Sequence, residues 1–220
     1  MPRFHIVLTT VLLSMSALAF AQNPTGQTGA YFLRGRVTGI QENQISVTPY
    51  SGGAPVTVPL ATGWTATVIN PADDSIVAVG NTVNIVEVDQ PDGVSWALFV
   101  DYLASRNGAA LPAGVPQSTV AMGRAWSQIP GKDQFGAWGT LGTIVSVEPT
   151  DRGLLVSTKI PEGVRKTIVP PGTVMVRNDR SAQSVVKVGE NVAVILRKGA
   201  DGKPTANRVL VGGKGTVPPM

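Results

Sequence analysis

The residues that could perform chemistry in this sequence are carboxylates, lysines, tyrosines and serines. The 220-residue chain contains no cysteine and one histidine, His5, which lies in a leader that we expect to be removed. This composition excludes a Ser-His-Asp triad or a Cys-His pair, an ordinary zinc site and haem ligation by His or Cys. Paired carboxylates could still hydrolyse a glycoside, but such enzymes usually have a deep cleft in a larger scaffold. We therefore predict that the protein is not an enzyme and has no catalytic residue, no metal and no cofactor.

Two short motifs resemble metal sites but are incomplete. Residues 89–93 have only part of the ligand series of a calcium loop, so we interpret them as a turn. Met122 near Trp126 resembles a soft-metal pair, but copper in such sites usually requires His or Cys as well. Neither motif changes the prediction that the protein binds no metal.

Three large aromatic residues, Trp126, Phe135 and Trp138, gather in the middle of the chain. Because aromatic side chains mostly bury apolar area, we expect them to pack against a barrel and fix two domains together. The alternative is an exposed platform for a sugar ring or a protein partner. Replacement of Trp138 by alanine separates the two interpretations, since only the loss of a buried ring would destabilise the protein.

Basic residues concentrate after Thr140, whereas the preceding part of the chain is slightly acidic. A basic half can attract nucleic acid, anionic glycan or lipid headgroups, although a solvated surface is the simpler interpretation. We expect no nucleic acid, because no Trp, Tyr or Phe follows Trp138 and single-strand binding depends on base stacking. The candidates for contact with an anion are Arg165, Lys166, Arg177, Arg180, Arg197 and Lys198.

The N-terminus has the features of a secretory signal peptide. A short basic start precedes an apolar stretch from Ile6 to Phe20, and the small residues Ala19 and Ala21 fit a signal-peptidase site. This stretch is short for a membrane span, and no later segment is long and apolar enough to be one. We therefore predict cleavage after Ala21, no transmembrane segment in the mature chain, and a location in the periplasm or outside the cell. An uncleaved anchor is the alternative.

An internal repeat organises the rest of the chain. Collinear glycines, core valines and turn residues match between the two halves, which indicates duplication rather than chance. The separation between partners grows by two residues at a hairpin loop, where a folded duplication tolerates a change of length. The aligned pairs include Gly35 with Gly142, Val37 with Ile144, Gly80 with Gly189, and Asp92-Gly93 with Asp201-Gly202.

The abundance of Gly, Pro, Val and Thr favours many short strands joined by turns, and Asp-Gly is a strong hairpin pattern. Residues 75–79 and 184–188 are each expected to form one helical turn that plugs a barrel end. We predict an all-β fold of two tandem small OB-like β-barrels, because a closed sheet has no exposed edge. The expected strands are 33–41, 44–49, 55–60, 64–69, 82–88 and 95–103, then 140–148, 153–159, 165–170, 173–177, 191–197 and 204–211.

The repeated pattern resembles a family of exported bacterial domains of unknown function. It consists of Gly-x-Val, a turn ending in Val-Gly, a Val-x-Val strand, Asp-Gly and Ala-x-x-Val, over residues 35–100 and 142–209. Such domains often occur in tandem and look OB-like, and the resemblance transfers no catalytic or ligand residue to this chain. A broader resemblance, to periplasmic OB-fold proteins, implies binding of a ligand or partner.

These observations divide the chain into six expected segments. They are a signal peptide (1–21), a flexible N-terminal segment (22–32), a first barrel (33–104), a Pro/Gly-rich linker with the aromatic cluster (105–139), a second barrel (140–211) and a flexible tail (212–220). The favoured function is a non-catalytic binding or assembly module of the bacterial cell envelope, whose partner is an unidentified protein or polysaccharide. One alternative is a carbohydrate-directed protein or weak carboxylate-based glycosidase. The other is a binder of anionic polymers through the basic second domain. The oligomeric state stays open.

Overall fold

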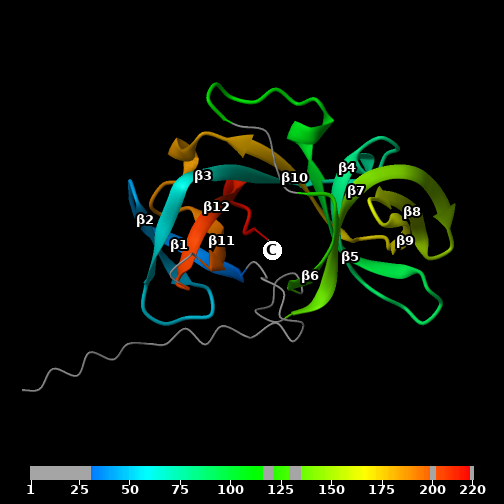
Figure 1. Ribbon diagram of the computed structural model, residues 1–220, viewed down its shortest axis with the longest axis horizontal. Helices are drawn as coiled ribbons and strands as arrows, with labels where there is room; N and C mark the ends of the chain where they lie inside the picture. Colours follow the sequence, from blue (N-terminus) through cyan, green and yellow to red (C-terminus); the bar gives the residue numbers. More distant parts are fainter. Residues whose placement is uncertain (1–30, 116–120, 129–134, 199–201, 219–220) are drawn as a thin grey trace, which may run out of the picture.

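The computed structural model describes residues 31–115, 121–128, 135–198 and 202–218, and this part of the chain is all-β, as expected. Twelve strands join into one continuous sheet, with short 3₁₀ helices between some of them (Figure 1). No helix in these ranges is long and apolar enough to cross a membrane. The expected signal peptide over 1–21 lies outside the described residues.

Five strands close into a first barrel, which lies on the left of Figure 1. Around this barrel the order is β12-β11-β1-β2-β3, and a parallel pairing of β12 with β3 closes it. The strands are β1 (Tyr31–Gln41), β2 (Gln44–Pro49), β3 (Val56–Ala72), β11 (Asn191–Lys198) and β12 (Pro204–Gly212).

A second barrel of five strands lies on the right of the same view. Its order is β5-β4-β7-β8-β9, and a parallel pairing of β5 with β9 closes it. The strands are β4 (Thr82–Val88), β5 (Ser95–Leu103), β7 (Phe135–Thr150), β8 (Gly153–Ile160) and β9 (Gly163–Val169).

The two barrels are joined by β10 (Val174–Ser181). This strand pairs antiparallel with the second half of β3 and parallel with β5, so one ladder of hydrogen bonds runs from barrel to barrel (Figure 1). The remaining strand, β6 (Gly123–Gln128), pairs with β7. The expected linker over 105–139 therefore contains a strand and the beginning of another, besides the end of the 3₁₀ helix η2 (Ala104–Asn107).

The barrels do not coincide with the expected segments 33–104 and 140–211. The first barrel takes β1–β3 from the first repeat and β11–β12 from the second, and the second barrel has the reciprocal composition. The cause lies in β3, which continues through the expected break between 60 and 64 and carries the following strands away from β1 and β2. Because both repeats offer the same apolar pattern along their edges, β4 and β5 find equivalent partners in β7 and β9, as in a domain swap.

The duplication is visible in the pairing itself. Gly80 donates its N–H to the carbonyl of Ile144 at 2.8 Å, and Gly189 donates to Val37 at the same distance. Both glycines have a positive φ, 92° and 94°, a conformation that side chains disfavour. The two glycines that the sequence aligned thus form equivalent hydrogen bonds, but each of these bonds joins one repeat to the other.

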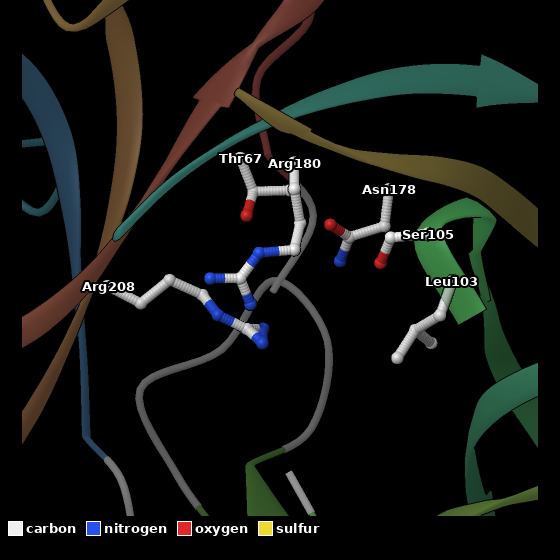
Figure 2. Close-up of a pocket in the computed structure, with 6 residues that line it drawn as sticks. All are labelled: Thr67, Leu103, Ser105, Asn178, Arg180 and Arg208. Carbon is white, nitrogen blue, oxygen red and sulfur yellow. The ribbon is translucent and has the colours of Figure 1, made fainter. Parts of the chain in front are cut away.

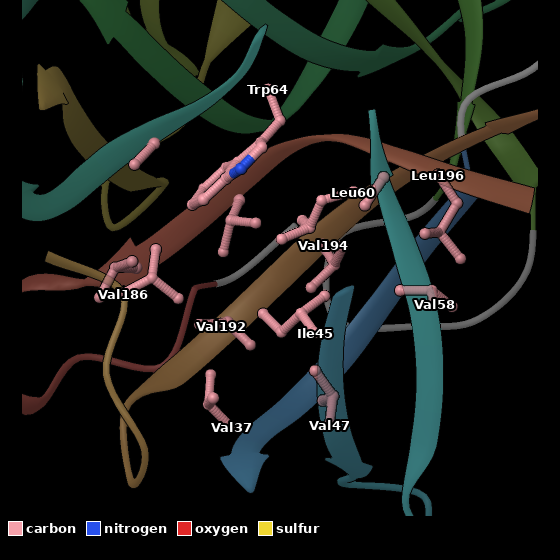
Figure 3. Close-up of a cluster of buried hydrophobic side chains, with 14 residues drawn as sticks. Val37, Ile45, Val47, Val58, Leu60, Trp64, Val186, Val192, Val194 and Leu196 are labelled. Atoms are coloured by element: carbon pink, nitrogen blue, oxygen red, sulfur yellow. The ribbon is translucent and has the colours of Figure 1, made fainter. Parts of the chain in front are cut away.

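Three apolar clusters hold the molecule together. One fills the first barrel, where Trp64 and Val186 lie with the inward-facing strand residues (Figure 3). Another fills the second barrel, closed by Ile76 at the end of the 3₁₀ helix η1 (Asp74–Ile76). Val186 follows the equivalent helix η3 (Gln183–Val185), so both expected helical turns plug a barrel. The third cluster, which includes Ile69 and Phe99, lies between the barrels.

Candidate anion-binding site

A small pocket lies where the two barrels meet, beside the strands that join them (Figure 2). It has a volume of about 10 Å³, which is close to the space that one water needs. Strands β3, β5, β10 and β12 and the helix η2 all contribute to it. The lining residues are Thr67, Leu103, Ser105, Asn178, Arg180 and Arg208.

The strand register brings two arginines to this pocket from either side of β3. Arg180 on β10 pairs opposite Thr67, and Arg208 on β12 pairs opposite Thr65. Figure 2 shows the two guanidinium groups next to one another in the pocket. Two like charges therefore share one small, half-buried space.

The pocket carries an excess of positive charge. Burial lowers the pKa of Arg208, and the nearby carboxylate of Asp101 opposes this effect. Three further guanidinium groups, those of Arg180, Arg197 and Arg106, also lower the pKa of Arg208 by repulsion. Burial lowers the pKa of Arg180 as well. This electrostatic strain would be relieved by a bound anion.

Several polar atoms around the pocket have no protein partner. Within the described residues, the Nε of Arg180 and the hydroxyl of Thr67 are buried without a hydrogen bond, and neither Arg180 nor Arg208 takes part in an ion pair. Buried polar groups are nearly always satisfied in native proteins, by protein, water or an ion. The unused donors point to a group that carries acceptors.

Asp101 is connected to the pocket through Asn178, which lines it. It is only 4% exposed and accepts a hydrogen bond of 3.1 Å from the side-chain amide of Asn178, while its second oxygen has no partner among the described residues. Burial raises the pKa of Asp101 to about 6, although the Asn178 hydrogen bond and Arg208 both act to lower it. A carboxyl group of this kind changes its charge close to neutral pH.

These polar groups occur in one copy of the repeat and not in the other. At the spacing of 109 residues that relates Asn70 to its hydrogen-bond partner Asp179, Arg208 corresponds to Phe99 and Asp101 to Leu210. Phe99 and Leu210 belong to the apolar cluster between the barrels. Charged residues therefore lie where the other repeat has apolar residues of a hydrophobic cluster, which is costly for the free energy of folding and suggests a role beyond stability.

A second polar cluster lies in the second barrel, but its charges are balanced. The buried carboxylate of Glu87 lies 3.3 Å from the Nε of Arg124 and 4.0 Å from that of Arg165. Both arginines also pair with Asp89. The corresponding residue to Glu87 in the first barrel is the buried Leu196. With two carboxylates for two guanidinium groups the charges of this cluster balance, although the Nε atoms of Arg124 and Arg165 are also buried without a hydrogen bond among the described residues.

The aromatic candidates lie on β6 and β7. Trp126 pairs opposite Trp138 in the ladder, while the side chains of Trp126 and Phe135 lie outside the described part of the structure. The ring of Trp138 is half-buried and the guanidinium carbon of Arg124 lies 4.4 Å from its centroid. Destabilisation by Trp138→Ala stays a prediction, which this stacking supports.

The basic candidates divide among several places. Arg180 lines the pocket and Arg197 lies within electrostatic range of it, whereas Arg165 belongs to the balanced cluster. Arg177 pairs with Asp179 at 2.8 Å, and Lys166 and Lys198 are exposed. Sequence reasoning missed Arg208, Asp101 and Asn178. A comparison of the two repeats for core positions that are polar in only one of them would have found all three.

Comparison with known proteins adds no relative: no family model, curated protein or solved structure matches this chain. In the described ranges, no three His, Cys, Asp or Glu residues lie close enough together to hold a metal ion.

Proposed function

We propose that the protein is a non-catalytic binding or assembly module of the bacterial cell envelope, and that it holds an anionic partner at the junction of its barrels. The observation that carries this proposal is the pair Arg180 and Arg208, which share one pocket without an ion-pair partner in the described part of the chain. The export and envelope location rest on the signal-peptide pattern in residues 1–21.

Arginine suits this role better than lysine would. Its planar group presents several donors in a fixed fork, which matches the oxygens of a carboxylate, phosphate or sulfate. The hydroxyl groups of Thr67 and Ser105 add further donors to the lining. Among the described residues, no carboxylate lines the pocket, so this part of the lining supplies donors to an anion and little to attract a cation.

The carbohydrate-directed alternative has less support. A sugar platform needs an open aromatic face, and Arg124 covers one face of Trp138. The balanced network around Glu87 also leaves no free carboxylate pair at that position to act as acid and nucleophile. The anionic ligand is therefore the better-supported partner.

Titration with heparin and with polyphosphate at several salt concentrations tests the proposal. In the double variant Arg180→Gln/Arg208→Gln we expect affinity to fall by at least about tenfold, because hydrogen bonds to charged groups contribute about 1.5–3 kcal/mol. The matched control is Lys166→Gln/Lys198→Gln, which removes the same charge from exposed positions of the basic half. An equal loss in both variants would show that only overall charge matters and would refute a site at the junction.

A further inference from the structure

We propose that the pocket binds a single compact oxyanion of the sulfate or phosphate type, and that Asp101 takes up a proton when the anion binds. This inference rests on the proposed function, since it concerns the same pocket. It adds the class of the bound group and a coupling of its affinity to pH.

The hydrogen-bond donors that line the pocket determine which chemical group it can bind. Two guanidinium groups and two hydroxyls converge from β3, β10, β12 and η2, so donors surround the space on several sides. This arrangement suits a group with oxygens in all directions better than a flat carboxylate. The volume of about 10 Å³ suits one water, so the arginine heads must move apart to admit an oxyanion. A polymer would therefore insert one terminal or pendant group rather than its backbone.

The uptake of a proton follows from the position of Asp101. Its carboxyl group accepts a hydrogen bond from the side-chain amide of Asn178, and Asn178 lines the pocket. Across the neighbouring ladders it faces Asn84 on β4 and Val176 on β10, which carry no charge. The positive charge that acts on it comes from Arg208 on β12.

The remaining charges around this site act on Arg208. They are the guanidinium groups of Arg106 on η2, Arg180 on β10 and Arg197 on β11. In the empty pocket, the hydrogen bond from Asn178 and the charge of Arg208 both stabilise the ionised form of Asp101.

A bound anion changes this balance. It occupies the guanidinium group of Arg208 and places a second negative charge near a carboxylate that is already buried. A like charge nearby favours the neutral form of a carboxylic acid, so Asp101 accepts a proton as the anion enters. Since the pKa of Asp101 is about 6 in the empty pocket and is higher with the anion bound, affinity for the anion rises as the pH falls towards that value and levels off below it.

Sulfate is the right probe because its charge stays constant across this pH range, whereas the second pKa of a phosphate group lies near about 6. Calorimetric titration of the purified protein with sodium sulfate, at about pH 5 and about pH 8, should show affinity that is higher at the lower pH by up to about tenfold per pH unit. Repeating the titration at about pH 7 in two buffers of different ionisation enthalpy counts the protons taken up, because uptake is greatest between the pKa values of Asp101 in the empty and in the occupied pocket.

Asp101→Asn supplies the matched variant, because asparagine has the shape of the neutral acid. We expect this variant to bind sulfate about equally at both pH values, with the affinity of the unchanged protein at low pH. Proton uptake of zero in the unchanged protein, or a pH dependence that persists in Asp101→Asn, would overturn the inference. Binding of sulfate without pH dependence would leave the proposed function intact, whereas no sulfate binding at either pH would remove both.

A second experiment identifies the molecule that carries the oxyanion. A sulfated disaccharide that binds more tightly than inorganic sulfate indicates a terminal group on a glycan, and equal affinity indicates the free ion. Both results support a compact oxyanion. Displacement of neither ligand by the other would contradict it, because the pocket has room for only one.

Discussion

Ile69 on β3 lies directly opposite Asn178 on β10, and these two residues occupy the same position in the two copies of the repeat. An antiparallel pair of equivalent residues places an approximate twofold axis between them, as at the interface of a symmetric dimer. The barrels are related by this axis. The residues on the two sides of the axis nevertheless differ in chemistry. Ile69 belongs to an apolar cluster, whereas Asn178 lines the arginine pocket.

Cleavage of the chain between the repeats tests the exchange of strands. A protease site inserted at the exposed Ala113 lies between β5 and β6. After cleavage, the two fragments should remain together in gel filtration and separate only in denaturant, because each barrel contains strands from both. Two independent tandem barrels would separate under native conditions, and that result would contradict the interleaved topology.

Substitution of Gly35 tests the close approach of β1 to β2. A Cβ at this position would overlap the carbonyl oxygen of Thr48, whereas a Cβ at Gly39 on the same strand would lie 3.5 Å from its nearest neighbour. We expect Gly35→Ala to lower the free energy of unfolding by about 2 kcal/mol or more, since overpacking forces the backbone to shift. Gly39→Ala should change it by less than about 1 kcal/mol. Urea denaturation measures both, and equal effects would refute the steric argument.

Glu87 tests the balanced network in the second barrel. The Glu87 carboxylate accepts hydrogen bonds from the hydroxyls of Thr140 and Thr167 and faces two arginines. Removing its charge leaves those guanidinium groups without their buried partner, so Glu87→Gln should destabilise the protein by about 3 kcal/mol. Arg152→Gln breaks an exposed ion pair with Asp92 and should cost less than about 1 kcal/mol. Thermal unfolding with similar midpoints for both variants would show that Glu87 does not stabilise the fold.

Asp101 should make stability depend on pH. Its folded-state pKa of about 6 lies above the ordinary value of 3.8, so the folded protein holds this proton more tightly than the unfolded chain. Its contribution is fully present below about pH 4 and is lost as the pH rises through 6. Asp101→Asn should therefore raise the free energy of unfolding by about 2–3 kcal/mol at about pH 8 and by little at about pH 4. Urea denaturation at both pH values checks this, and a gain of equal size at both would contradict the assignment.

Much of the fold could be predicted from the sequence, because local patterns determine it. Eleven of the twelve strands overlap expected segments, and the turns at Gly80, Gly93, Gly189 and Gly202 have the positive φ that favours glycine. Strand β6 was missed, since its sequence lacks the alternation of β-branched and polar residues that marks a half-buried strand. The exchange of strands was missed for a different reason: both repeats have the same apolar pattern, so neither specifies which copy completes its barrel.

The candidate site was only partly predictable. Arg180 and Arg197 were among the basic candidates, but a strand residue such as Arg208, between Asn207 and Val209, looks like the exposed half of an ordinary alternation. The topology turns this residue towards the junction, where its counterpart Phe99 is buried. Long-range strand pairing determines whether this residue is buried, so the local sequence cannot reveal it.

The central claim is that an anion occupies the space between Arg180 and Arg208. Crystals of the protein grown with sodium selenate, which has the shape and charge of sulfate, allow the anion to be located by anomalous scattering. We predict an anomalous peak between the two guanidinium groups, within hydrogen-bonding distance of Thr67 or Ser105. A pocket that contains no peak at saturating selenate, with peaks only beside exposed lysines, would contradict the account.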